Sequence, residues 1–174
     1  MNPIKTIQNI CFVVLFVLPF GLKAQNVGYI NDYSISSEEF VWLFNKHNKD
    51  KGANTYNNLS KYLDLYINYK LKVLEAKKMK MDLDSSFIVE VQNFEKIIKP
   101  KYKFRKREME FVLNEYKDGV LMFNVTEKLI WEPLYASNTA DAELIEKKET
   151  EWIKELRSKY KIVVVEEELK KLSR

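Results

Sequence analysis

Few side chains in this sequence are of the types that do catalytic chemistry. Its 174 residues include one histidine, His47, and one cysteine, Cys11. A single imidazole excludes a mechanism with two histidines, and a single thiol excludes an internal disulfide and a multi-thiolate metal site. We expect His47 to be a solvated or capping side chain at a helix end. The sequence has no glycine-rich phosphate loop and no Ser/His/Asp set, so we predict no catalytic residue, no metal and no cofactor.

Two acidic pairs resemble acid–base sites but have a simpler role as helix caps. Glu38 and Glu39 follow Ser36, whose hydroxyl is expected to cap the amide of Glu39 while the Glu39 carboxylate reaches back. Asp82 and Asp84 precede another helical pattern and are expected to cap it. Capping accounts for both pairs, so neither is predicted to be catalytic.

Aromatic side chains are the more informative group, because 13% of the chain is Phe, Trp or Tyr. One interpretation is that most of them pack a core, where each buried apolar side chain contributes about 1.5–3 kcal/mol. The other is that some line a groove that binds many different polypeptides, a task that suits tyrosine and methionine. The residues predicted to line such a groove are Tyr62, Tyr66, Tyr69, Phe87, Phe94, Tyr102, Phe104, Trp131 and Tyr135.

The composition favours a helical protein with no affinity for nucleic acid. Hydrophobic residues make up 46% of the chain and charged residues 31%, with only four glycines and four prolines. These values are typical of a globular domain and argue against a loop-rich β-sandwich. The net charge of +4 is too small to indicate nucleic-acid binding. The basic run at residues 99–107 is either a solvated face or a contact for an acidic partner or lipid headgroups.

The first 24 residues have the features of a signal peptide. Lys5 supplies a positive start, residues 10–20 are apolar, and cleavage is expected near Ala24 and Gln25. The apolar run is shorter than the roughly 20 residues needed to cross a bilayer, so an uncleaved anchor is the alternative rather than the first interpretation. We therefore expect an exported, periplasmic protein.

Helical patterns alternate with breaking residues along the rest of the chain. Pro100 is predicted to end or kink one helix, because proline lacks the amide hydrogen and crowds the preceding turn. Gly119 is predicted to end the following helix as a C-cap. Asn124 with Glu127 predicts the start of the next, and the state of residues 120–123 stays open. Further helices are predicted at residues 36–47, 59–81 and 140–158.

Two β-forming runs lie at opposite ends of this helical region, at residues 27–30 and 162–165. An isolated strand leaves its backbone groups unpaired, so each run needs a partner, and each is the best candidate for the other. The predicted fold is therefore mainly α, with a small sheet that pairs the N- and C-terminal strands. That pairing makes residues 25–174 a single domain.

Several segments resemble the SurA/PpiD-like periplasmic chaperones. Residues 27–40 (VGYINDYSISSEEF) are similar to the opening strand, turn and capped helix of that family. Residues 62–78 (YLDLYINYKLKVLEAKK) resemble its long second helix. Residues 114–123 followed by Trp131, and residues 151–164, resemble the late region of parvulin-type members. The resemblance implies a SurA-like chaperone core built from an N-terminal segment (25–98) and a C-terminal segment (110–174).

The chain departs from that family at its centre. Members with prolyl isomerase activity insert parvulin domains there, and residues 98–110 leave no room for a domain of about 100 residues. The family's sites use paired histidines, which this chain lacks. The resemblance thus implies an ATP-independent holdase for unfolded or outer-membrane client polypeptides. The alternatives are an accessory subunit that docks on one envelope protein or on itself as a homodimer, and, by family membership, a peptidyl-prolyl isomerase without a parvulin site.

Overall fold

The computed structural model describes residues 25–48, 54–103, 105–139 and 141–173. This part of the chain is 78% helical and contains a small antiparallel sheet of three strands. The prediction of a mainly α protein is therefore confirmed. The predicted signal peptide lies outside the described residues, as does Phe104.

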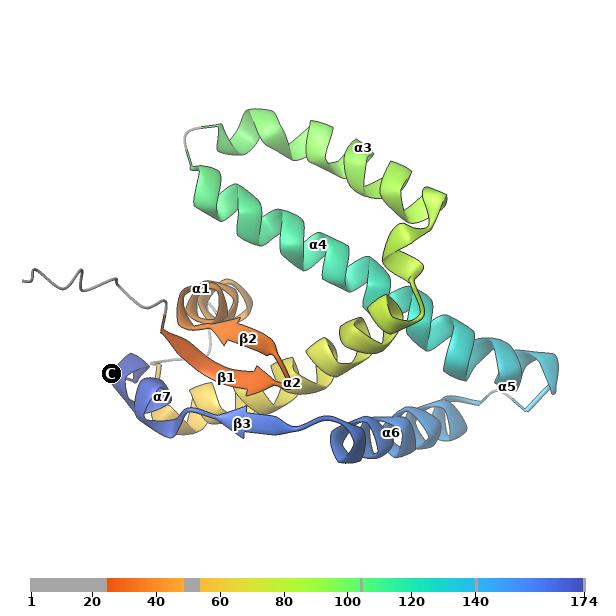
Figure 1. Ribbon diagram of the computed structural model, residues 1–174. Coiled ribbons are helices and arrows are strands. Elements are labelled where there is room, and N and C mark those ends of the chain that lie inside the picture. The colour runs from red at the N-terminus through yellow and green to blue at the C-terminus, as the bar shows by residue number, and fades with distance from the viewer. Residues whose placement is uncertain (1–24, 49–53, 104, 140, 174) are drawn as a thin grey trace, which may run out of the picture.

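The sheet joins the two ends of the described chain (Figure 1). Its central strand is β1 (Asn26–Ile30), flanked by β2 (Tyr33–Ser36) and β3 (Ile162–Val164). β1 and β3 are antiparallel, with Tyr29 opposite Val163, so the predicted pairing of the terminal strands is confirmed. A Cβ atom on Gly28 would lie 2.9 Å from the carbonyl oxygen of Val163, which explains why this position lacks a side chain.

The turn between β1 and β2 also holds the C-terminal part of the chain. Asn31 has a φ of 50°, a left-handed conformation that asparagine tolerates. Its amide donates to the carbonyl of Lys161 at 2.8 Å, and its side-chain oxygen accepts from the amide of Lys161 at 2.8 Å. The turn was expected, but β2 was not predicted.

The first two helices are α1 (Ser37–His47) and α2 (Tyr56–Lys78). The predicted capping box of α1 is wrong: Ser36 occupies the N-cap but makes no side-chain capping bond. α2 begins earlier than residue 59, because Thr55 caps it by accepting from the amide of Asn58 at 3.3 Å. It ends at Lys78, just before Lys80 adopts a φ of 60°.

A helical hairpin of α3 (Ser85–Tyr102) and α4 (Lys106–Thr126) follows a short turn, η1 (Met81–Leu83), and extends from the body (Figure 1). Asp84 caps α3 as predicted, accepting from the amide of Ser86 at 2.9 Å. Pro100 does not end α3, which continues to Tyr102. The proline lies in the last turn, where its missing amide removes one hydrogen bond and few residues remain to be displaced.

Two predicted boundaries inside α4 are wrong. The helix passes through Gly119 and Asn124 without a break, so residues 120–123 are helical. Leu121 and Val125 are almost completely buried there. Their burial outweighs the cost of a glycine in a helix interior, which is about 1 kcal/mol.

The helical path then continues through a π-helical segment, η2 (Glu127–Trp131), into α5 (Glu132–Ala136). Residues 137–139 interrupt the helical path after α5. α6 (Ala142–Lys159) begins after it, capped by Asp141, which accepts from the amide of Leu144 at 2.7 Å. The tail after β3 forms α7 (Glu166–Leu172).

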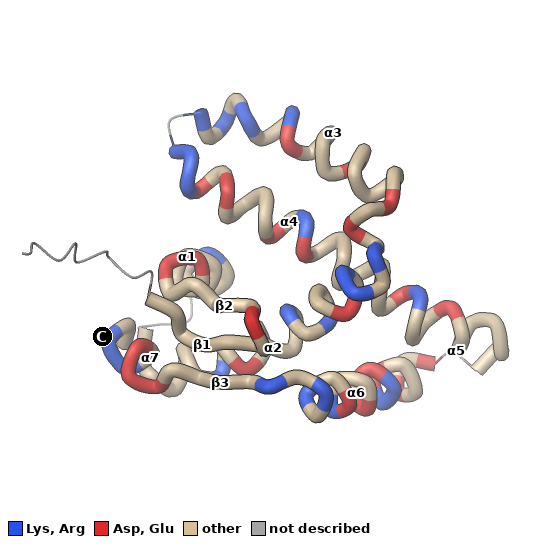
Figure 2. Tube along the Cα trace, in the orientation of Figure 1, with Lys and Arg blue, Asp and Glu red and all other residues tan. Residues whose placement is uncertain are grey.

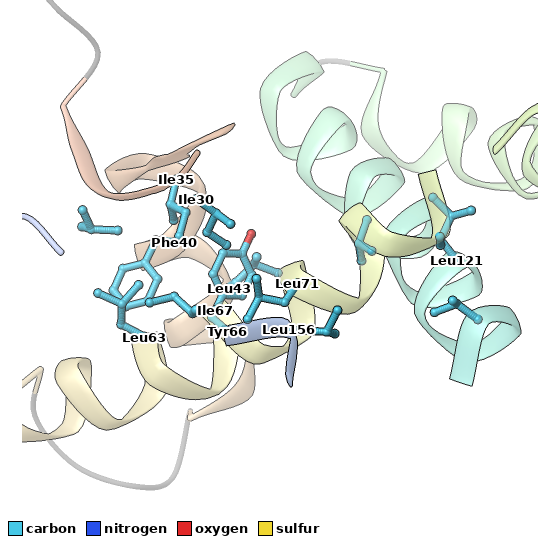
Figure 3. Packing of buried hydrophobic residues seen from close by; sticks show 14 of the residues in the cluster. Ile30, Ile35, Phe40, Leu43, Leu63, Tyr66, Ile67, Leu71, Leu121 and Leu156 are labelled. Atoms are coloured by element: carbon cyan, nitrogen blue, oxygen red, sulfur yellow. The ribbon is translucent and has the colours of Figure 1, made fainter. Parts of the chain in front are cut away.

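The core lies around α2, which packs against α1, α4, α6 and α7. Apolar side chains from the sheet and from these helices meet along its length. Figure 3 shows buried side chains of this core. The buried residues drawn there include Ile30, Ile35, Phe40, Leu43, Leu63, Tyr66, Ile67, Leu71, Leu121 and Leu156. α2 therefore provides the scaffold on which any site between α1 and α4 is built.

Candidate functional site

Three tyrosines form a ladder along one side of α2. Tyr62, Tyr66 and Tyr69 are spaced at four and three residues, which places them on one helix face. The ring centroids of Tyr62 and Tyr66 are 6.3 Å apart with an interplanar angle of 17°, and those of Tyr66 and Tyr69 are 6.0 Å apart at 27°. Phe40 and Phe44 of α1 pack against Tyr62, with centroids at 5.6 and 5.3 Å. These two phenylalanines of α1 therefore hold the Tyr62 end of the ladder in place.

The ladder lines an open hollow between α1, α2 and α4, which we name the tyrosine hollow. Its volume is about 360 Å³. Leu65 at its edge is 65% exposed, so apolar surface continues from the hollow to the outside. The lining residues are Glu39, Leu43, His47, Tyr62, Leu65, Tyr66, Tyr69, Lys70, Glu115 and Gly119.

A buried ion pair lies beside the ladder. The Lys70 ammonium is 2.5 Å from Oδ2 of Asp118 on α4, and the two residues are only 3% and 7% exposed. Glu39 of α1 lies 3.8 Å from the same ammonium. The ammonium also lies 5.0 Å from the ring centroid of Tyr66 and 5.9 Å from that of Tyr69. Lys70 therefore joins α2 to α1 and α4 through ionic contacts, while its cation–π contacts are with tyrosines of α2 itself.

The pKa values around Lys70 are consistent with a charged pair in a dry setting. Burial alone lowers the pKa of an ammonium, but Tyr66 and Asp118 outweigh burial and raise the pKa of Lys70. Burial raises the pKa of Glu39, and Lys70 only partly opposes that shift. Burial likewise raises the pKa values of Tyr66 and Tyr69. Lys70 remains protonated at neutral pH, and so do both phenols.

His47 connects the ladder to α4. Its Nδ1 lies 2.9 Å from the hydroxyl of Tyr62, and its Nε2 lies 2.8 Å from Oε1 of Glu115. A carboxylate only accepts hydrogen bonds, so Nε2 donates to Glu115. In the neutral tautomer that carries its proton on Nε2, Nδ1 accepts from the Tyr62 hydroxyl. The ammonium of Lys46 pairs with the other oxygen of Glu115. His47 is the last residue of α1 and its side chain is 46% exposed, as expected for a solvated side chain at a helix end. The sequence did not predict that the ring also bridges α2 and α4.

A Tyr–His–Glu arrangement has the connectivity of a proton relay, but the Tyr62 phenol is poorly suited to act as the reacting group of such a relay. Burial and the nearby charge of Glu115 raise the pKa of Tyr62 to about 12. A phenol with that pKa is neither a ready nucleophile nor a base near neutral pH. The arrangement is better suited to holding the walls of the hollow in place than to chemistry.

A second hollow, the hairpin hollow, lies on the other side of Glu115 and Gly119. Its volume is about 540 Å³. Phe94 of α3 stacks on Tyr116 of α4, with ring centroids 3.7 Å apart at 5°, and the Tyr116 hydroxyl donates to Glu90 at 2.8 Å. The lining residues are Lys46, Glu90, Phe94, Val112, Glu115, Tyr116, Gly119, Val120, Phe123 and Asn124. Since the two hollows share Glu115 and Gly119, they form one discontinuous groove along α4.

The structure gathers some of the predicted groove residues and separates others. Tyr62, Tyr66 and Tyr69 line the tyrosine hollow, and Phe94 lines the hairpin hollow. Phe87 is buried near Asp118. The other three described residues lie elsewhere: part-buried Tyr102 at the end of α3, Trp131 against Phe123, and Tyr135 exposed on α5.

Sequence reasoning missed the polar half of the site. Lys70 follows Tyr66 by four residues on an otherwise apolar stripe of α2, and a lysine in that position was an available signal for a buried charge. No local signal marked Asp118 as the partner of Lys70 or Glu115 as the partner of His47, because each carboxylate lies more than 40 positions further along the chain than its partner.

Comparisons with known proteins assign no relative: no protein-family model matches the chain, and neither the curated proteins nor the solved structures contain a significant match. Within the described ranges, no cluster of three or more His, Cys, Asp or Glu side chains is arranged to hold a metal ion. No helix in that part of the chain has the length and apolar character to cross a bilayer.

Proposed function

We propose that this protein is an exported, ATP-independent chaperone: a SurA-like core without isomerase domains that holds unfolded or outer-membrane polypeptides in the tyrosine and hairpin hollows. The observation that carries the proposal is the convergence of three stacked tyrosines on one open, largely apolar hollow. Such a surface offers large aromatic faces without a fixed pattern of donors and acceptors. It therefore suits side chains of many shapes.

The chemistry of the site also favours binding over catalysis. The phenols of the ladder keep their protons but already have partners within the protein: Tyr66 donates to Glu39 at 3.5 Å and Tyr69 to the carbonyl of Glu115 at 3.3 Å. The ladder therefore offers clients its aromatic rings rather than free hydrogen-bond donors. The buried Lys70–Asp118 pair and the His47 bridge fix the helices that form the walls. A preformed groove loses less entropy on binding than one that must be assembled around each client.

Gly119 provides a sharp test, because it lines both hollows and a Cβ atom there meets nothing within 4 Å. The variant Gly119→Leu places a branched side chain into that space. Leucine also favours the helix over glycine by about 0.8–1 kcal/mol, so the variant should melt at or above the wild-type temperature. We expect it to need roughly ten-fold more protein to suppress aggregation of an unfolded outer-membrane protein, because the leucine side chain occupies client space and a loss of about 1.4 kcal/mol in client binding is a ten-fold loss of affinity.

Gly119→Ala is the matched control. It brings the same gain in helix propensity with only one added methyl group, so it should keep the wild-type holdase activity. Failure of the wild-type chain to suppress aggregation at several-fold excess would contradict the proposal. Equal activity of the leucine and alanine variants would show that clients bind elsewhere.

The second candidate is an accessory subunit that docks permanently on one envelope partner or on a second copy of itself. Apolar side chains outside the two hollows favour it, since Leu83, Ile97 and Tyr135 are each more than 60% exposed. A pull-down from cells distinguishes the two functions. One stoichiometric partner favours the subunit, and a heterogeneous set of unfolded clients favours the chaperone.

A further inference from the structure

The end of α3 and the start of α4 concentrate the positive charge of the protein. Residues 95–108 contain seven Lys or Arg and two Glu. This segment has a net charge of 7 − 2 = +5. The net charge of the whole chain is only +4, so the rest of the chain is close to neutral. We name residues 95–103 and 105–108 the basic tip. Figure 2 shows its blue segments gathered where the α3–α4 hairpin ends.

The basic tip presents its charges to solvent. Lys96, Lys101 and Lys106 are exposed. The guanidinium groups of Arg105 and Arg107 pair with Glu108 and Glu38, yet their side chains remain 69% and 72% exposed. Surface ion pairs of this kind are weak and leave the cations available to a stronger array of anions.

An apolar side chain accompanies these charges. Ile97 follows Lys96 directly and is 62% exposed. Cations flanking an exposed aliphatic residue are typical of surfaces that rest on a bilayer, because the cations contact headgroups while the aliphatic side chain enters the boundary of the acyl chains. A surface for an acidic protein needs the charges but not the projecting isoleucine.

The described chain also begins beside the basic tip. Gln25 and Arg107 line the same hollow, which has a volume of about 920 Å³, and Arg107 pairs with Glu38 at the start of α1. The first described residue therefore lies on the same side of the protein as the basic tip.

From this charge and this exposed isoleucine we infer that the basic tip docks the protein on an anionic phospholipid bilayer. The inference is independent of client binding, because the tip shares no residue with the tyrosine hollow or the hairpin hollow. Each Lys or Arg at an anionic membrane surface strengthens binding by about five-fold. The contribution falls steeply with salt, because the Debye length shrinks to about 3 Å at 1 M.

The test uses the full chain and vesicle flotation. Affinity is measured for vesicles that contain phosphatidylglycerol and for pure phosphatidylcholine vesicles, and the ratio removes whatever the apolar run contributes to both. We expect the wild type to prefer the anionic vesicles and to lose that preference in high salt. The variant Lys96→Gln/Lys101→Gln/Lys106→Gln, which breaks none of the ion pairs described above, should reduce the ratio by about 100-fold.

The matched control removes three exposed lysines from η2 and α6, as Lys128→Gln/Lys147→Gln/Lys154→Gln. It has the same net charge as the tip variant and should keep the wild-type ratio. An equal loss in both variants would overturn the inference, since net charge alone would then explain binding. The inference would also be overturned if the wild type bound soluble polyglutamate but showed no preference for anionic vesicles.

Discussion

Replacing Lys70 by methionine tests whether the buried charges beside the tyrosine ladder are paired as described. Methionine keeps the length and apolar stem of lysine but removes the ammonium. Asp118 then loses a partner at 2.5 Å and Glu39 loses one at 3.8 Å. Removing one member of a buried pair typically costs about 3–5 kcal/mol. Lys77, which lies 3.8 Å from Asp118, offers partial compensation, so we expect the lower part of that range.

The converse variant should be milder. Asp118→Asn leaves Lys70 with Glu39 as a second carboxylate, whereas Lys70→Met leaves two carboxylates without their shared cation. The double variant Lys70→Met/Asp118→Leu removes the pair at 2.5 Å and leaves only the more distant Glu39 without its cation. It should recover most of the loss, because a buried pair adds little over well-packed apolar groups.

Thermal unfolding followed by circular dichroism measures these effects. For a chain of this size each kcal/mol shifts the melting temperature by about 2–4 °C, so a loss of about 3 kcal/mol from Lys70→Met lowers it by roughly 6–12 °C. A variant that melts within about 2 °C of the wild type would refute the reasoning. A double variant less stable than either single variant would do so as well.

Three further predictions follow from contacts elsewhere. Gly28→Ala should destabilise the protein by about 1–3 kcal/mol in urea unfolding, because its Cβ atom would meet the backbone oxygen of Val163 at 2.9 Å; an unchanged midpoint would contradict the close approach of β1 and β3. Burial raises the pKa of Glu75, but hydrogen bonds from Lys159 and Tyr160 outweigh burial and leave that pKa lowered. The ionised carboxylate therefore stabilises the fold above the unfolded-state pKa, and this contribution is lost as pH falls through the lowered value. Glu75→Gln should thus be less stable than the wild type at pH 7, with a difference that shrinks below about pH 4; a constant difference across pH would argue against the ion pair. In a proline-peptide assay the protein should leave the isomerisation time at its uncatalysed value of about tens to hundreds of seconds at 25 °C. A saturable acceleration would instead show that the protein is an isomerase.

The elements predicted correctly from the sequence are those with a strong physical requirement. The pairing of the terminal strands follows from the need of every strand for a partner. The cap at Asp84 follows from a local side-chain pattern. β2 was missed because it is only four residues long and because Ser36 carried a capping signal that the structure does not use. Gly119 gave a local signal for a helix end and Asn124 gave one for a helix start, and burial of the surrounding α4 residues overrode both.

The site likewise has one part that the sequence predicts and another part that it does not. The spacing of Tyr62, Tyr66 and Tyr69 already placed them on one face of a long helix, which is a property of local geometry. The partners of Lys70 and His47 depend on how α1, α2 and α4 cross. That arrangement brings together side chains separated by 48 and 68 positions in the sequence, and no local pattern encodes it.

The bond between Asn31 and Lys161 has a consequence for the order in which the protein can form. The two residues are 130 positions apart, so β1 gains its second neighbour only after the ribosome has released β3. Until then, one edge of the N-terminal hairpin remains open to any extended segment that passes by. Closing so long a loop is slow relative to local helix formation. We therefore expect folding to end when β3 pairs with β1. Translation products that stop before β3 keep an unpaired edge on β1, and we expect proteases to degrade them.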